Sequence, residues 1–380
     1  MRTMEAIFWL CVAGTGFSYF LYPALLLVFP VRPIRKSSAT TLPRISVIIA
    51  ARNEARRIAA KLEGTLALDY PADLLEIIVA SDASDDETDA IVQSFESRGV
   101  RLSRTPTRGG KEAAQARAIQ KALGDILVFT DSATRLDPDA LRRIADAFTD
   151  PTIGAVSSED RMEGSADGSA GSSEGAYVRY EMWLRRLESD RAGLVGLSGS
   201  LFAVRRKIAS GWPTTVPSDI TAALLTARAG LRAIADPELF GHYPDLRNTH
   251  NEYERKLRTV VRGMAAVAAQ RALLNPFRFG LFSLQLWGHK VMRWMTPVFM
   301  LLLLILSAIL APVSGIYLAF LLLQCAVYVL AALTWVVPAL RRISVFRLTL
   351  YLVQVHLALL HAVWRYLRGE RIVMWTPSVR

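Results

Sequence analysis

The chain has very few cysteines and none of the glycine-rich loops that hold nucleotide phosphates in many α/β proteins. Two of its 380 residues are cysteine, and Cys11 and Cys325 both lie in apolar segments. Cysteines so few and so placed provide neither a disulfide framework nor a zinc site. No G-x-G-x-x-G or Walker-type sequence is present. The sequence therefore predicts neither a dinucleotide-binding Rossmann motif nor a P-loop.

Charged residues are missing from two long segments of the chain. Ala6–Val31 and Trp294–Leu340 contain no Asp, Glu, Lys or Arg, and about 20 apolar residues are enough to cross a bilayer. The second segment is interrupted at Pro312–Gly315, which divides it into two spans. A further apolar run, Leu348–Trp364, has 17 residues and is at the short end for spanning. We expect three membrane spans, with Leu348–Trp364 lying in the interface rather than crossing.

Basic residues flank the apolar segments on the side of the central polar region. They follow the first span and precede the second, at Arg32, Arg35, Lys36, Arg44, Arg278, His289, Lys290 and Arg293. Basic residues near membrane ends stay in the cytoplasm, so we predict an integral protein of the inner membrane with a cytoplasmic central domain. Membrane lipids with anionic headgroups account for the net charge of +11. The scattered basic residues predict no nucleic-acid partner.

The central region alternates short apolar strands with amphipathic helices. The predicted strands are Ile45–Ala50, Glu76–Ala80 and the apolar run that ends at Asp131. Continuous apolar strands that alternate with helices are typical of a parallel sheet covered on both faces. The sequence therefore predicts an α/β fold with a Rossmann-like, mixed but mostly parallel sheet.

Polar side chains follow each of these predicted strands. Asn53 and Glu54 come after the first strand, Asp82 after the second, and Asp131 ends the third. Because ligands bind outside the carboxyl ends of parallel strands, we expect these side chains at one edge of the sheet. Carboxylates repel a bare phosphate, but a divalent cation (Mg²⁺ or Mn²⁺) can bridge a carboxylate and a diphosphate. Lys111, in a Gly-rich turn before a helix, is suited to neutralising phosphate charge.

Several sequence blocks occur in a particular order along the chain. They are "SVIIAARNE", "VASDASDDET", "RGGKEAAQARAI", "FTDSATRLDPDAL", "GSLFAVRR", "PSDITAALLTARAG", "YERKLRTVVRG" and "HKVMRWMTP". With these blocks the chain resembles the membrane-bound family 2 glycosyltransferases with the GT-A fold, near polysaccharide and poly-N-acetylglucosamine synthases. The resemblance runs from about residue 44 to the C-terminus and depends on the order and spacing of the blocks.

The resemblance implies a role for each matching position. Asp131 matches the first carboxylate of the metal-binding DxD motif, and Asp219 matches the general base. Arg258 matches the basic position that steadies the leaving diphosphate. The residues that would hold the uridine part of a UDP-sugar donor are Ala51, Asn53, Glu54 and Asp82. The acceptor channel would be lined by segments that contain Tyr180, Glu181, Gly199 and Ser200.

The chain departs from the family pattern at three positions. Ala133 stands in place of the second DxD carboxylate, Ser218 replaces the first acid of the catalytic pair, and Thr259 replaces the Trp of the QxxRW-like motif. His242 is an alternative metal ligand, although a loop histidine is the simpler interpretation. Since that Trp stacks the acceptor sugar in the family, transfer of a single sugar onto a polyprenyl phosphate stays open. A degenerate, non-catalytic scaffold is the third alternative.

Four regions follow from these observations. Residues 1–34 are the predicted N-terminal transmembrane anchor and 35–273 the cytoplasmic GT-A domain. Residues 274–293 are a predicted interfacial amphipathic helix, and 294–380 hold the C-terminal membrane or interface helices and a basic tail. The predicted activity is inverting sugar transfer from a UDP-sugar donor to a glycan or lipid-linked acceptor at the cytoplasmic membrane face, in exopolysaccharide or cell-envelope glycan synthesis.

Overall fold

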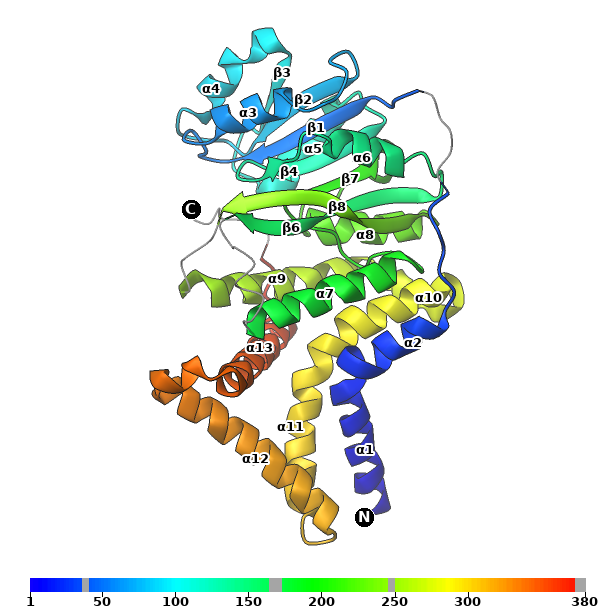
Figure 1. Cartoon of the computed structure of the whole chain (residues 1–380), viewed down its shortest axis with the longest axis vertical. Coiled ribbons are helices and arrows are strands. Elements are labelled where there is room, and N and C mark those ends of the chain that lie inside the picture. The colour runs from blue at the N-terminus through cyan, green and yellow to red at the C-terminus, as the bar shows by residue number, and fades with distance from the viewer. Residues whose placement is uncertain (36–40, 164–172, 245–249, 373–380) are drawn as a thin grey trace.

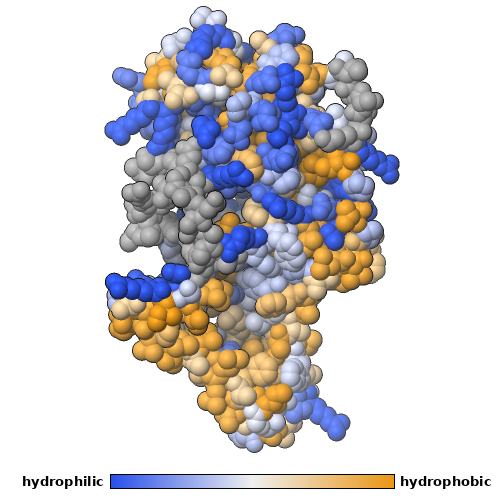
Figure 2. Space-filling view, in the orientation of Figure 1, coloured by the Kyte–Doolittle hydropathy of each residue, from blue (hydrophilic) through white to orange (hydrophobic). Residues whose placement is uncertain are grey.

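The computed structural model describes residues 1–35, 41–163, 173–244 and 250–372. Figure 1 shows an α/β half at the top and a helical half below it, with the N-terminus at the lower end. Apolar residues cover much of the lower half in the face seen in Figure 2, whereas hydrophilic residues dominate the upper half. The two halves differ in composition as well as in fold.

The α/β half is built on one eight-stranded sheet within the described residues. The strand order is β3-β2-β1-β4-β7-β6-β8-β5, with β1 to β4 parallel and β7 antiparallel to both β4 and β6. The predicted mixed sheet is confirmed. The strands are β1 Ile45–Ala51, β2 Leu75–Ser81, β3 Val100–Arg104, β4 Ile126–Asp131, β5 Arg135–Leu136, β6 Ile153–Glu163, β7 Leu201–Arg205 and β8 Arg232–Pro244.

Helices cover both faces of the sheet. Alternate residues of β1 belong to different core clusters, Val47 to one and Ile48 to the other, and the whole strand is buried. Burial on both faces explains why such a strand is a continuous apolar run. The helices of this half are α3 Ile58–Leu66, α4 Thr88–Ser94, α5 Lys111–Lys121, α6 Ala140–Ala147, α7 Ser173–Ser189, α8 Ser218–Arg228 and α9 His250–Ala269.

Four helical segments in the described chain are long and apolar enough to cross a membrane. They are Arg2–Val28, Pro276–Leu310, Gly315–Val336 and Ser344–Leu367. The first comprises α1 Arg2–Gly16, η1 Phe17–Leu21 and α2 Tyr22–Val28, and the second comprises α10 Pro276–Leu286, η6 Trp287–Val291 and α11 Met292–Leu310; α12 and α13 are the third and fourth. The chain turns between α11 and α12, where the sequence predicts the break, and Ser314 caps α12.

The interfacial positions predicted for residues 274–293 and Leu348–Trp364 stay predictions, because both segments lie in helices that are long and apolar enough to cross a membrane. Gly280 has a positive φ of 51° and interrupts α10, and α10 is inclined to α11 in Figure 1. α13 packs against the α/β half through Ala362, which is buried with Leu257 and Val261 of α9. The last apolar helix therefore lies directly below the α/β domain.

The N-terminal helical segment makes a close contact with η6 and a polar network with α7 of the α/β half. A Cβ on Gly288 would lie 2.3 Å from the Tyr22 ring, so glycine is needed for this approach. Tyr22 donates its hydroxyl hydrogen to Glu188 of α7 at 2.5 Å, and His289 Nδ1 lies 2.8 Å from the same carboxylate oxygen. The π-helical turns η1 and η6 meet at this junction. Such turns often mark functional sites.

Candidate active site

The ends of β1, β2 and β4 come together at one edge of the sheet. The strand register pairs Ala51 with Ser81 and Ala50 with Asp131. Asn53 and Asp82, which follow two of these strands, are therefore held at the same edge as Asp131. The predicted convergence of the polar strand ends is confirmed.

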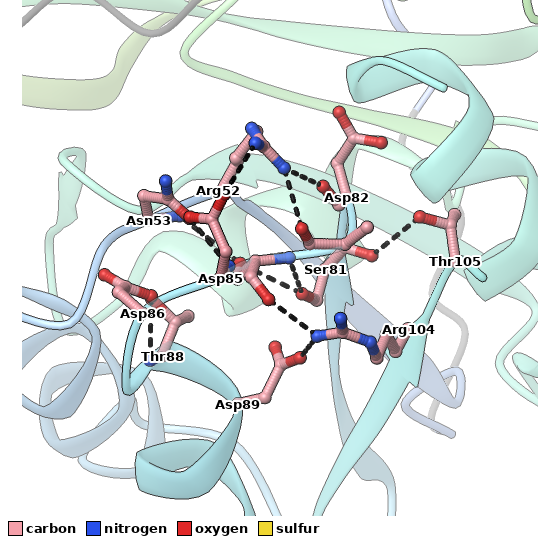
Figure 3. Close-up of polar contacts among 12 residues, drawn as sticks. Arg52, Asn53, Ser81, Asp82, Asp85, Asp86, Thr88, Asp89, Arg104 and Thr105 are labelled. Atoms are coloured by element: carbon pink, nitrogen blue, oxygen red, sulfur yellow. Dashed lines mark hydrogen bonds and ion pairs between the residues drawn. The ribbon is translucent and has the colours of Figure 1, made fainter. Parts of the chain in front are cut away.

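Arg52 holds the loops after β1 and β2 together. Its Nη1 donates to the backbone carbonyl oxygens of Asp82 and Ala83, both at 2.7 Å, as Figure 3 shows. Asn53 accepts from the backbone N–H of Asp85 at 3.1 Å. Asn53 and Ala83 have positive φ angles of 53° and 50°, the two non-glycine cases in the described residues. Backbone strain of this kind clusters at binding sites.

Glu54 and Ala51 are placed beside this loop. The Glu54 backbone N–H donates to Thr88 Oγ1 at 2.8 Å, while its carboxylate lies 3.8 Å from Arg57. Ala51 is the buried last residue of β1. Neither lines the pocket described below, so their assignment to the uridine stays a prediction.

Asp82 is buried and positions the Gly-rich turn before α5. Its Oδ1 accepts from the backbone N–H groups of Gly109 and Gly110 at 2.7 and 3.0 Å. Gly110 has a φ of +92°, which a side chain would strain. The Asp82 carboxyl group is directed away from the Arg52 side chain in Figure 3. Asp82 therefore fixes the turn that presents Lys111, in addition to any contact with a nucleotide that the resemblance implies.

One cleft brings together five of the predicted site residues. Lys111 Nζ lies 2.6 Å from Asp131 Oδ1 and donates to the Gly199 carbonyl oxygen at 3.1 Å. A Cβ on Gly199 would lie 3.5 Å from Asp219 Oδ2. These residues line a cavity of about 190 Å³, together with Arg258 of α9. The predicted residues thus bring two carboxylates and two cations into the cleft from four separate elements, α5, β4, α8 and α9.

Lys111 keeps its charge in this cleft. Burial opposes its protonation, but the Asp131 carboxylate outweighs burial and raises the pKa of the Lys111 ammonium. Asp219 is the second residue of α8, after Ser218, and its Oδ1 accepts from the Ile220 N–H at 2.8 Å. Pro217, not Asp219, is the N-cap residue. The Asp219 Oδ2 atom faces the cleft near Gly199 and can accept a proton there.

A divalent cation fits the donor set at Asp131 only with help from a substrate. Mg²⁺ at nucleotide sites is often held by one or two carboxylates plus phosphate oxygens and water. Asp131 supplies one carboxylate and Ala133 supplies none. No group of three or more His, Cys, Asp or Glu side chains is placed to hold a metal in the part of the chain that the structure describes. Asp131 can therefore share a cation with a diphosphate, but the protein forms no complete cage there.

His242 does not complete the metal site. It lies in β8 rather than in a loop, so the loop interpretation is wrong. Its Nε2 is 3.0 Å from Asp137 Oδ1, and β8 pairs it with Arg135. His242 is thus paired with Asp137, and it does not line the cleft.

Asp160 is a carboxylate beside the cleft that the sequence analysis misses. It accepts hydrogen bonds from Ser200, and from Ser198 Oγ at 2.6 Å. Loss of hydration raises the pKa of the Asp160 carboxyl, and the negative charge of Asp131 adds to the effect. Ser200, assigned to the acceptor channel by the resemblance, is thus bonded to Asp160, and its backbone carbonyl accepts from the Asp131 N–H. No motif points to Asp160, because β6 reaches this edge only through the fold.

Lys61 is buried behind Asp131. Its Nζ donates to Thr130 Oγ1 at 3.1 Å and to the Thr134 carbonyl oxygen at 2.5 Å. Burial lowers the pKa of the Lys61 ammonium to about 7, although Asp131 acts in the opposite direction. A lysine in the middle of an amphipathic helix gives no sequence sign of this position.

Lys61→Met tests this position through the pH dependence of stability. The unfolded chain holds the proton up to about pH 10.5, whereas the folded chain releases it near pH 7. Stability therefore rises with pH between these values, and the wild type should gain about 2 kcal/mol relative to Lys61→Met from pH 7 to 9. Thermal unfolding of both proteins across that range measures the difference. A constant difference would show that Lys61 has an ordinary pKa.

The cleft also contains a buried ion pair that the sequence analysis did not assign. Arg262 Nη2 of α9 lies 2.6 Å from Glu112 Oε1 of α5, and both side chains are buried. This pair ties the helix that carries Lys111 to the helix that carries Arg258. The recurrence of arginine every three or four residues in α9, at Arg255, Arg258 and Arg262, is the signal that could have found it.

The predicted acceptor residues Tyr180 and Glu181 lie outside this cleft. Tyr180 donates to the backbone carbonyl oxygens of Ser18 and Tyr19 at 3.3 and 3.0 Å, so it contacts the N-terminal helix. Glu181 lies 2.5 Å from Arg293 Nη1 and lines a second cavity of about 310 Å³. Burial opposes ionisation of Glu181, but His289 and Arg293 hold the pKa of its carboxyl well below the usual range.

Comparison with known proteins agrees with this geometry. The sequence profile described as "Glycosyl transferase family 2" matches residues 46–211, which include the strand ends, Lys111, Asp131 and Gly199. The chain is similar to the beta-monoglucosyldiacylglycerol synthase of Synechocystis sp., with 26% identity over 198 residues that cover 50% of this chain and 41% of that protein. It is also similar to an N-acetylglucosaminyltransferase of Rhizobium meliloti, with 31% identity over 129 residues, 33% of this chain and 30% of the other.

One solved structure resembles the whole chain. It is the mannosyltransferase PcManGT from Pyrobaculum calidifontis in complex with GDP-Man and Mn²⁺, with a TM-score of 0.72 and 24% identity. The match covers 97% of this chain and 100% of that structure, so the helical half is included. The likeness shows a common fold. The chain spans less than half the length of the curated relatives named above.

Proposed function

We propose that this enzyme, whose residues 46–211 match the family 2 glycosyltransferase profile, moves a sugar from a UDP-sugar to a glycan or lipid-linked acceptor with inversion. The reaction would take place at the cytoplasmic face of the inner membrane, in exopolysaccharide or cell-envelope glycan synthesis. The observation that carries the proposal is the cleft shared by Lys111, Asp131, Asp219 and Arg258. A carboxylate and two cations in one cleft support the proposed roles of Asp219 as proton acceptor and of Lys111 and Arg258 as ligands of the leaving diphosphate.

The proposed transfer is a single displacement. An acceptor oxygen forms a bond to the anomeric carbon while the bond from that carbon to the donor diphosphate breaks. Asp219 takes the proton of the acceptor hydroxyl, and the nucleoside diphosphate leaves with the electron pair of the broken bond. Lys111 and Arg258 hold its phosphates by charge-assisted hydrogen bonds. A Mg²⁺ or Mn²⁺ ion held by Asp131 would supply further neutralisation of the diphosphate.

The role of Asp131 can be tested by binding alone. UDP should bind at least about tenfold more tightly with Mn²⁺ than with a chelator, and Asp131→Asn should remove that difference, which corresponds to about 1.4 kcal/mol. Calorimetric titration measures both affinities. Asp125→Asn is the matched control, because Asp125 lies exposed just before the other end of β4. If the wild type binds UDP equally well with Mn²⁺ and with a chelator, Asp131 is not a metal ligand.

The donor and product can be identified with one panel of substrates. Purified full-length enzyme is incubated with radiolabelled UDP-sugars, with GDP-mannose as a guanine-nucleotide comparison, and with membrane lipids. A labelled polymer would indicate a polysaccharide synthase, and a labelled single sugar on lipid would indicate a lipid glycosyltransferase. If no donor is transferred or hydrolysed and UDP does not bind, the result would support the scaffold alternative and contradict the proposal.

A further inference from the structure

A second cavity lies between the catalytic half and the candidate membrane spans. Its volume is about 310 Å³, and its walls come from α7, α9, α11, α13 and the N-terminal helix. Val355, Ala358 and Leu359 of α13 form an apolar wall. The opposite part is strongly basic, since four cations, at Arg255, Lys256, Lys290 and Arg293, face one carboxylate, that of Glu181. This combination suits a ligand with an anionic end and an apolar end.

Arg293 has hydrogen-bond donors that no group in the described part of the chain satisfies. Its side chain is buried, and Nη1 contacts Glu181 Oε1 at 2.5 Å. Its Nε and Nη2 atoms are buried without a partner in the described part of the chain. Leaving charged donors unsatisfied in the interior is costly. The free side of this guanidinium therefore points to an anionic ligand.

Lys290 is a second cation that lines this cavity. Its ammonium forms no hydrogen bond or ion pair with any described residue. Glu181 pairs with Arg293, and Glu188 Oε1 is bonded to Tyr22 and His289, whereas Glu188 Oε2 is buried without a partner among the described residues. Lys290 and Arg293 thus face the same space, and Glu181 is the one carboxylate of the described chain that lines it.

The cavity adjoins the catalytic cleft. Arg255 and Thr259 of α9 line both spaces. Lys290 Nζ would lie 3.6 Å from a Cβ on Gly196, in the same loop that carries Gly199 beside Asp219. Thr259, the small residue in place of the family tryptophan, stands between the two spaces. A headgroup held at Lys290 and Arg293 is therefore beside the proposed base.

We propose that this cavity binds the phosphate of a membrane lipid and that this lipid is the sugar acceptor. The proposal rests on the proposed function and specifies its acceptor. The guanidinium of Arg293 and the ammonium of Lys290 bind the headgroup phosphate, for which a planar donor fork and a point charge are complementary. The lipid chain lies along the apolar wall of α13. The protonated oxygen of the headgroup phosphate forms a bond to the anomeric carbon and gives its proton to Asp219, while the bond from that carbon to the donor diphosphate breaks and the nucleoside diphosphate leaves with the electron pair.

Lipid binding to the full chain in uncharged detergent tests the proposal. Native mass spectrometry compares phosphatidic acid with diacylglycerol of identical acyl chains. We expect the wild type to bind phosphatidic acid at least about tenfold more tightly than diacylglycerol. Lys290→Gln should bind phosphatidic acid about tenfold more weakly than the wild type does, which is the loss expected for one charged hydrogen bond. Arg293→Lys can keep the contact with Glu181 and should lose part of the affinity for phosphatidic acid. Arg342→Gln is the charge-matched control, because Arg342 is exposed at the end of a candidate span.

The outcomes separate the two proposals. Equal binding of both lipids, or equal losses in Lys290→Gln and Arg342→Gln, would overturn the lipid-phosphate site. Displacement of the lipid by inorganic phosphate at equal concentration would overturn it too, because it would assign the site to a soluble anion. UDP titrations run in parallel test the donor site independently. Retained UDP binding without lipid selectivity refutes only this inference, whereas absent UDP binding by the wild type refutes the proposed function.

Discussion

Asp219→Asn is expected to lower the rate of sugar transfer by about 10²- to 10⁴-fold, the usual contribution of a positioned general base. Asparagine has nearly the same shape but cannot take the acceptor proton. Its side-chain oxygen can still accept from the Ile220 N–H, so the start of α8 should be kept. Initial rates with a saturating donor measure the effect. UDP affinity should be unchanged, because the proposed donor contacts come from other residues.

The control for this variant is Asp73→Asn, which removes one exposed carboxylate in the loop before β2. Its transfer rate should equal that of the wild type. Asp219→Glu should recover little activity, since a longer side chain displaces the carboxylate from its place beside Gly199. Transfer by Asp219→Asn at the wild-type rate would show that another group takes the proton, or that the acceptor arrives already ionised.

Lys111→Gln is expected to weaken UDP binding by about 10- to 100-fold, from about 1.5 to 3 kcal/mol for a hydrogen bond to a charged group. The substitution removes the ammonium that lies 2.6 Å from Asp131. It leaves the carboxylate of Asp131 without its cation, so repulsion between Asp131 and the diphosphate adds to the loss. Calorimetric titration with UDP measures the change.

Lys121→Gln is the matched control for Lys111→Gln. Lys121 is the exposed last residue of the same helix, α5, so both variants lose one charge from one helix. The control should bind UDP as the wild type does. Equal affinity in Lys111→Gln and the wild type would assign Lys111 a structural role, as the residue that ties Asp131 to the Gly199 loop.

Local sequence patterns were sufficient to predict the strands and the polar residues at their ends. The runs before Asn53, Asp82 and Asp131 are continuous and apolar because their strands are buried on both faces. Parallel strands place their carboxyl ends at one edge, so the convergence of these residues follows from the pattern. The positions of Lys111, Asp219 and Arg258 in one cleft came from the resemblance, since no local rule brings α5, α8 and α9 together.

Other parts of the site could not be predicted, because they depend on contacts between distant segments. Asp160 and Lys61 lie beside Asp131 only because of the fold, in which β6 is separated from β4 by β7 and Lys61 of α3 reaches Thr130 of β4. The buried pair of Glu112 and Arg262 joins residues 150 positions apart. Tyr180, assigned to the acceptor channel by the resemblance, contacts the N-terminal helix, which is 161 positions away in the sequence.

The sequence by itself determined the α/β class, the apolar segments and the polar strand ends, because hydrophobic periodicity and local charge decide these. Only the tertiary structure decided which charges meet. The partners of Lys111 and Asp131, the turn held by Asp82 and the unsatisfied donors of Arg293 depend on distances between separate helices and strands. Electrostatic interactions fall off over a few ångströms in space, whatever the separation along the chain, so their pairing requires the fold.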